Sequence, residues 1–115
     1  MAPLEFDTTL SSAGDALIAL TGELDLSGAP ALDHEIEQLA ASPGVRRVIL
    51  DLRGLAFLDS SGLRSVALAA RRLTDSGRSL VLVRGRESVQ RVFEITRMVE
   101  QLEFVDHPEL NGGSP

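Results

Sequence analysis

Several residue types are missing from this chain, and each absence excludes a class of chemistry. The chain has no cysteine, so disulfide bridges, thiolate catalysis and zinc–sulfur sites are excluded. It has no lysine either, because all 11 basic side chains are arginine. This excludes a P-loop, whose lysine contacts the terminal phosphates, and any enzyme that forms a Schiff base. Tryptophan and tyrosine are absent, so we expect no aromatic platform on which nucleic-acid bases could stack.

The net charge and the length of the apolar runs narrow the class further. The charge is −6 and the isoelectric point is near 4.8, which disfavours a nucleic-acid partner, since contact with phosphates needs a basic surface. The apolar runs are far too short to cross a bilayer and no charged-then-apolar leader opens the chain, so we expect no membrane insertion and a cytoplasmic location. A length of 115 residues suits one domain with a single core.

Hydrophobic periodicity predicts strands that alternate with helices. Alternation predicts a half-exposed edge strand over residues 4–10, and apolar runs predict further strands over 16–24, 48–52, 80–83 and 104–105. Stripes at helical spacing predict helices over 32–40, 63–73 and 89–96, with helix continuing or re-forming over 98–102. This alternation is typical of an α/β domain whose parallel strands are joined by right-handed crossovers.

Glycines indicate where the regular elements are interrupted. Gly22 lies inside the second strand and predicts a bulge or the close approach of another backbone. Residues 53–55, Arg-Gly-Leu, are expected to break the third strand, and Gly77 is placed to end the helix that follows. Between the break and that helix, Phe57 and Leu58 are expected to lie in the core, with the alternative that part of this loop contributes to an interface.

The stretch 48–73 holds the main candidate site, where the third strand leads into a helix. Residues 59–62, Asp-Ser-Ser-Gly, favour a helix start, because Asp and Ser side-chain oxygens accept from free backbone N–H groups. A hydroxyl in that first turn faces unpaired N–H groups and the positive end of the helix dipole, which tolerate an added phosphate. Either serine could instead be only a cap, and position alone does not choose between Ser60 and Ser61.

Residues 48–73, VILDLRGLAFLDSSGLRSVALAARRL, strongly resemble the STAS domain, and within it the anti-sigma factor antagonists of bacteria. The likeness extends to residues 20–25 upstream and 91–96 downstream, so it covers almost the whole chain. It implies a mixed, centrally parallel sheet with an N-terminal edge strand and with helices packed chiefly on one side. We therefore expect a STAS domain over residues 1–108 and a disordered tail over 109–115.

The resemblance also implies a site and a function. In such antagonists the second serine of the Asp-Ser-Ser-Gly-Leu segment is phosphorylated, which maps to Ser61 here. The unphosphorylated domain would bind an anti-sigma factor, a serine kinase with a histidine-kinase-like ATPase fold, and so release the sigma factor. The residues expected to contact this partner surround the serine: Asp25, Asp59, Ser60, Gly62, Leu63 and Arg64. From its position one turn from Ser61, Arg64 either pairs with acidic groups of the partner or belongs to an ordinary solvated basic face. We expect no catalytic residue, cofactor or metal. The sequence is compatible with a monomer or a weak homodimer.

Two positions near the ends of helices need separate comment. Asp25 follows the second strand as Asp59 follows the third, and it is the N-cap of the first helix, a contact to the kinase, or both. Because sites form where strands end and helices begin, Asp25 and Asp59 should share one edge of the molecule. Arg97-Met98 departs from the family, which often has Gly-Leu there, and this difference concerns the end of the third helix.

A receiver domain, a serine hydrolase and one other binding role compete with this interpretation. Asp51 invites comparison with the phosphorylated aspartate of receiver domains, but the lysine and acidic pair of such a site are missing, so we expect a structural role. A serine hydrolase needs Gly-x-Ser-x-Gly, and residues 58–62 lack the leading glycine. The only candidate bases, His34 and His107, have no motif around them. The alternative that keeps the fold is a scaffold subunit of a lipid-transport or stress-signalling complex, without phosphorylation of Ser61.

Overall fold

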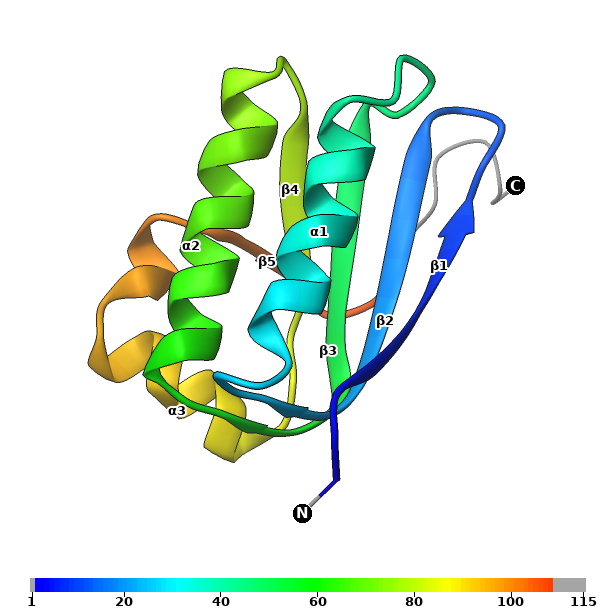
Figure 1. Cartoon of the computed structure of the whole chain (residues 1–115). Helices are drawn as coiled ribbons and strands as arrows, with labels where there is room; N and C mark the ends of the chain where they lie inside the picture. Colours follow the sequence, from blue (N-terminus) through cyan, green and yellow to red (C-terminus); the bar gives the residue numbers. More distant parts are fainter. Residues whose placement is uncertain (1, 109–115) are drawn as a thin grey trace.

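The computed structural model describes residues 2–108 and shows a five-stranded sheet with helices packed against it (Figure 1). The strands are β1 (Glu5–Leu10), β2 (Asp15–Leu24), β3 (Arg47–Leu58), β4 (Ser79–Val83) and β5 (Glu103–Val105). The helices are α1 (Ala29–Ala40), α2 (Ser60–Asp75), α3 (Glu87–Ile95) and the short 3-10 helix η1 (Met98–Glu100). The tail predicted over residues 109–115 lies outside the described residues.

The sheet is mixed, and its strands lie side by side in the order in which they occur in the chain. β1 pairs antiparallel with β2 at one edge, whereas β2, β3, β4 and β5 run parallel to one another. α1 and α2 lie next to each other on one face of the sheet, and α3 packs against β3 (Figure 1). The predicted fold class is therefore confirmed, with the N-terminal edge strand and the helices chiefly on one side.

Alternate side chains of the strands form the core beneath α1 and α2. The buried apolar side chains of this core include Ile18, Leu20, Val48, Leu50 and Leu82 from the sheet and Leu32, Ile36, Val66, Leu73 and Phe93 from the helices. Each such side chain contributes about 1.5–3 kcal/mol when it leaves water. The apolar side chains that predict the inner strands therefore also hold the helices on the sheet.

β3 is longer than the sequence predicts, and the expected break at residues 53–55 is wrong. The strand runs from Arg47 to Leu58, and its pairing with β2 shifts register instead of ending. A Cβ atom on Gly54 would lie 2.7 Å from the carbonyl oxygen of Leu20. The glycine thus permits close approach of the two strands at a bulge, which absorbs an extra residue without stopping the strand.

A second register shift lies next to Gly22 and changes which side chains of β3 face the core. Gly22 has a φ of +87°, and a Cβ there would lie 2.2 Å from the carbonyl oxygen of Pro3, so the predicted bulge and close approach are both confirmed. Beyond the shift, Leu58 is 4% exposed but Phe57 is 46% exposed. The core assignment is therefore right for Leu58 and wrong for Phe57, because the extra residue reverses the alternation.

The third helix ends at Ile95, although the chain lacks the glycine that the family often has after the threonine. Thr96 is the C-cap, and Arg97 takes a left-handed backbone conformation with φ of 63° and ψ of 14°. Glycine adopts this conformation without strain, whereas another L-residue loses about 1–2 kcal/mol through contact of its Cβ with the following carbonyl. The backbone therefore keeps a glycine-type ending around an arginine.

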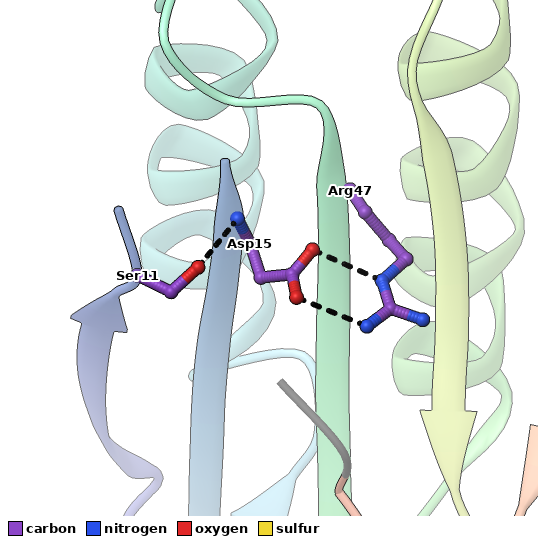
Figure 2. A network of polar contacts seen from close by, with 3 residues as sticks. All are labelled: Ser11, Asp15 and Arg47. Atoms are coloured by element: carbon purple, nitrogen blue, oxygen red, sulfur yellow. Dashed lines mark hydrogen bonds and ion pairs between the residues drawn. The ribbon is translucent and has the colours of Figure 1, made fainter. Parts of the chain in front are cut away.

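The sheet face turned away from α1 and α2 carries a buried ion pair between the first residues of β2 and β3. Arg47 donates from Nε to Asp15 Oδ1 at 3.1 Å and from Nη2 to Oδ2 at 3.0 Å (Figure 2). The backbone N–H of Asp15 donates to the Ser11 hydroxyl. The Asp15 side chain is only 2% exposed, and the guanidinium of Arg47 compensates its charge.

Asp51 forms a second ion pair on the same face, with Arg53 two residues further along β3. Its Oδ1 accepts from the backbone N–H and the Nε of Arg53, and its Oδ2 accepts from Nη2 at 2.9 Å. Burial alone would raise the pKa of Asp51, but the hydrogen bonds and charge of Arg53 outweigh it and hold that pKa below its ordinary value. These contacts give Asp51 the structural role that the sequence predicts.

Candidate functional site

The mouth of α2 is closed by Asp59, which is the N-cap of the helix. Asp59 has an extended backbone, and its Oδ1 accepts a hydrogen bond of 2.9 Å from the backbone N–H of Gly62. Its carbonyl oxygen accepts from the N–H of Leu63 at 2.9 Å. One carboxylate oxygen therefore satisfies a donor that a helix start would otherwise leave unpaired. The capping role left open for the two serines belongs to Asp59.

Ser60 and Ser61 occupy the first two positions of α2. The Ser60 side chain is exposed and that of Ser61 is half-buried. Neither hydroxyl makes a hydrogen bond with any residue in the described part of the chain. Both oxygens are thus uncommitted, within reach of solvent, and next to the positive end of the helix dipole. The geometry does not by itself choose between the two serines.

The structure brings the two loops that carry Asp25 and Asp59 together at the carboxyl ends of β2 and β3. Leu24 and Leu58 are the last paired residues of β2 and β3, and each aspartate comes directly after one of them. A Cβ on Gly62 would lie 2.3 Å from the carbonyl oxygen of Leu24. Only glycine therefore lets the first turn of α2 lie this close to the end of β2. Gly62 itself is buried, so it sets the spacing of the site.

Asp25 does not cap α1, so that interpretation is wrong. The N-cap of α1 is Gly28, which has no side-chain cap. Asp25 instead accepts at Oδ1 from the backbone N–H groups of Ser27 at 3.0 Å and Gly28 at 3.1 Å. This turn fixes the carboxylate before the helix begins. A negative side chain is therefore held in place beside the mouth of α2.

Two apolar side chains are exposed at this same end of the strands. Leu26, in the loop between β2 and α1, is 75% exposed, and Phe57, near the end of β3, is 46% exposed. Leu26 is not among the contact residues that the sequence predicts, and Phe57 belongs to the segment for which an interface is the alternative to the core. Leu26 could have been found as the apolar residue inside a polar turn, whereas Phe57 depends on the bulge. Exposed apolar groups beside polar ones are typical of a protein-binding surface.

The remaining predicted contact residues, Leu63 and Arg64, lie on the first turn and a half of α2. Leu63 is half-buried and packs against the core, whereas Arg64 is exposed. Arg64 makes no hydrogen bond or ion pair with any residue of the described range. Its guanidinium is therefore available one turn away from Ser61.

Neither histidine is positioned as a base for the serines. His34 lies in α1, where its ring nitrogen is hydrogen-bonded to Gln38. His107 lines a depression on the opposite sheet face, together with Arg47 and Ile49. Within residues 2–108 there is also no group of three or more His, Cys, Asp or Glu side chains that could hold a metal ion. No helix in this range has the length and apolar character needed to span a membrane.

Comparison with known proteins identifies the family. A family model described as "Mlab, STAS domain" matches residues 8–105. The chain belongs to the STAS domain family. This STAS domain is also 37% identical over 83 residues to BtrV of Bordetella bronchiseptica, which carries the name of an anti-sigma factor antagonist. That alignment covers 72% of this chain and 71% of BtrV, so the domain groups with the antagonists, as the resemblance implies.

Solved structures of other antagonists share the fold of this STAS domain. An anti-sigma factor antagonist from Mycobacterium paratuberculosis has a TM-score of 0.77 at 23% identity, covering 95% of this chain and 89% of its own. The antagonist SpoIIAA in its unphosphorylated form has a TM-score of 0.76 at 23% identity, covering 88% of each chain. The phosphorylated form of SpoIIAA, from Bacillus, has a TM-score of 0.70 at 22% identity, covering 88% of this chain and 91% of its own.

Proposed function

We propose that this STAS domain is an anti-sigma factor antagonist that is controlled by phosphorylation of Ser61. In the unmodified form it binds an anti-sigma factor with serine-kinase activity, and this releases the sigma factor for transcription. Phosphorylation by the same partner ends the binding. The domain thus acts in the cytoplasm as a regulatory binding module and has no catalytic step of its own.

Two relatives support the choice of partner and of switch. BtrV, at 37% identity, carries the name of an anti-sigma factor antagonist. SpoIIAA, which shares the fold, is known in an unphosphorylated and a phosphorylated form. An antagonist of this fold can therefore accept a phosphate and keep its architecture.

The observation that carries the proposal is the uncommitted hydroxyl of Ser61 at the second position of α2. Asp59 already caps the helix, so phosphorylation of Ser61 would break no hydrogen bond within the described residues. The added phosphate would carry about −1.5 to −2 charge at neutral pH. The positive end of the helix dipole would stabilise that charge, so no refolding is needed for the switch.

Local electrostatics explains why the phosphate would end binding. The carboxylates of Asp25 and Asp59 lie at the same edge as Ser61, and a partner surface that faced a neutral hydroxyl would meet a dianion. Two unit charges about 4 Å apart interact by roughly 4 kcal/mol at an effective dielectric of about 20. Even a third of this energy weakens binding by about tenfold.

The chemistry requires one group from this chain. The Ser61 oxygen attacks the γ-phosphorus of ATP, the bond between that phosphorus and the bridging oxygen of ADP breaks, and the hydroxyl proton passes to a base of the kinase. ATP, Mg²⁺ and the base all belong to the partner. The absence of lysine and of a nearby histidine is therefore no obstacle to this role.

The test is phosphorylation by each candidate anti-sigma kinase of the same organism, followed by mass spectrometry of the peptide that spans residues 59–64. We expect one phosphate, on Ser61, in the wild type and in the matched control Ser60→Ala, and none in Ser61→Ala. Ser61→Ala should bind the kinase constitutively, whereas Ser61→Asp should bind at least about tenfold more weakly. Equal affinities of wild type, Ser61→Asp and the phosphorylated protein would refute the switch.

The same experiment separates the scaffold alternative. A scaffold subunit of a lipid-transport or stress-signalling complex would bind its partner with ATP or ADP present and gain no phosphate. Ser61→Asp would then leave its affinity unchanged. Pull-downs with and without nucleotide distinguish the two roles, because only the antagonist would lose its partner after incubation with ATP.

A further inference from the structure

We propose that Arg64 is the intramolecular receptor for the phosphate on Ser61, so that the modified domain holds its own phosphate in an ion pair. This inference rests on the proposed function, because it concerns the same serine. It adds a residue whose task begins only after phosphorylation. The ligand is a phosphoserine dianion, and the binding group is a single guanidinium on the same helix.

The neighbours of Arg64 on its own helix are uncharged. Residues three and four apart on a helix lie on one face, and for Arg64 these are Ser60, Ser61, Ala67 and Leu68. None of them offers an anion to Arg64 in the unmodified protein. A phosphate on Ser61 would be the first anion at one of these positions. Side chains of a helix also lean toward its N-terminus, and the serines are on that side of Arg64.

Other helical arginines of this protein show what such a neighbour does. Arg91 pairs at 3.0 Å with Glu87, four residues before it in α3. Arg71 pairs at 4.0 Å with Asp75, four residues after it in α2. In contrast, Arg64 makes no ion pair or hydrogen bond in the described part of the chain. Relative to Arg64, Ser60 occupies the position of that glutamate, four residues before, and Ser61 lies three residues before, at the other spacing that brings side chains together on a helix face.

An ion pair between Arg64 and the phosphate would change the charges that the domain presents to its partner. Arg64 is exposed and so presents a free cation beside the hydroxyl in the unmodified domain. After phosphorylation the guanidinium would form charge-assisted hydrogen bonds to the phosphate, and these are stronger and more directional than neutral ones. The modification would then add a negative group and also remove an available positive one. Asp25 and Asp59, whose carboxylates are held in the loops at this end of the strands, are both negative.

The experiment measures the second pKa of phosphoserine in the free domain by ³¹P NMR. Phosphoserine is placed at position 61 during translation or by chemical synthesis, so that no kinase is required. Removing a paired cation raises the pKa of a phosphate, and we expect Arg64→Gln to raise it by about half a unit. The matched control Arg71→Gln removes the same charge two turns further along α2 and should shift the pKa by less than about 0.1 unit.

Two further measurements keep the result specific. Arg64→Lys should restore part of the lowered pKa, because it restores the charge without the planar fork. About 1 M salt should shrink the difference between wild type and Arg64→Gln. Equal shifts for Arg64→Gln and Arg71→Gln, or no shift for either, would overturn the proposal. Because the titration contains no partner, this outcome is distinct from a failure of the kinase experiment.

Discussion

The backbone N–H of Asp59 donates a hydrogen bond of 3.3 Å to the carbonyl oxygen of Leu24, which ties the start of α2 to the end of β2. Asp25 follows Leu24 directly, so this bond also fixes the distance between the two aspartate loops. The candidate site is therefore assembled by main-chain contacts. Its side chains can be changed one at a time while the frame stays in place.

The exception is Gly62, where an added methyl group would collide with a main-chain oxygen and with a leucine side chain. Its Cβ would lie 2.3 Å from the Leu24 carbonyl oxygen and 2.6 Å from Leu58 Cδ1. We expect Gly62→Ala to lower the free energy of unfolding by about 1–3 kcal/mol in urea titrations, as overpacked sites do. Gly44→Ala is the control, because no atom lies within 4 Å of its Cβ. Similar losses in both variants would contradict this account of the spacing.

The contribution of the Asp59 side chain as a helix cap can be measured separately from the contribution of its negative charge. We expect Asp59→Ala to lower the free energy of unfolding by about 1 kcal/mol, because the N–H of Gly62 loses its acceptor. Asp59→Ser should retain most of the stability, since a serine oxygen also caps a helix. Urea unfolding of the three proteins provides the measurement. Equal stability of Asp59→Ala and the wild type would mean that the cap is not stabilising.

The buried pair of Asp15 and Arg47 should matter far more than the exposed ion pairs. Arg47→Met would leave the carboxylate of Asp15, which is 2% exposed, without its bidentate partner, and we expect a loss of about 3 kcal/mol. Arg72→Met is the control, because its pair with Glu37 is exposed on both sides and should be worth less than about 1 kcal/mol. Thermal unfolding monitored by circular dichroism gives both values. A smaller loss for Arg47→Met than for Arg72→Met would contradict the prediction.

The stability of the domain should depend on acid through Asp51. Because Arg53 holds the pKa of Asp51 below its ordinary value, the ionised form favours the folded state. Its contribution is complete above the unfolded pKa of about 3.9 and is lost as the pH falls through the lower folded value. We therefore expect Asp51→Asn to be less stable than the wild type at pH 7, with the difference shrinking in acid. A difference that grows below about pH 4 would reverse the assigned sign.

A substitution at Arg97 should increase stability. Its left-handed backbone, with φ of 63°, suits glycine, so Arg97→Gly would remove strain at the end of α3. After allowance for the greater freedom of glycine in the unfolded chain, we expect a gain of about 0.5–1 kcal/mol. Arg97→Ala keeps the Cβ and should give no such gain. A loss of stability for Arg97→Gly in urea would show that the arginine side chain contributes more than its backbone costs.

The order of strands and helices could be predicted from the chain because burial leaves a periodic pattern. Ile18 and Leu20 alternate in β2 as the core requires, and Gly77 ends α2 with a φ of +79°. The course of β3 could not be predicted in the same way. A glycine such as Gly54 is compatible with a break or with a bulge, and the approach of β2 decides between them. The exposure of Phe57 follows from the same approach of β2, so it could not be predicted from the pattern either.

The site could be predicted in part. The order of strand and helix was enough to place Asp25 near Ser61, since both follow neighbouring parallel strands. The contacts of individual atoms were not accessible from the pattern, because several residues at a helix start can cap it. The structure assigns the cap of α2 to Asp59 and a turn to Asp25. Exposure of Leu26 likewise depends on how its loop folds back.

The ion pair of Asp15 and Arg47 lies at the opposite ends of β2 and β3 from Ser60 and Ser61. Substitutions at the first end can therefore change the stability of the domain. Substitutions at the second end can change which partner it binds. A more stable variant of the domain should be sought at the first end, where we expect substitutions to leave the binding specificity of the second end unchanged. Paralogues could then differ in their binding partners while they keep the same stable fold.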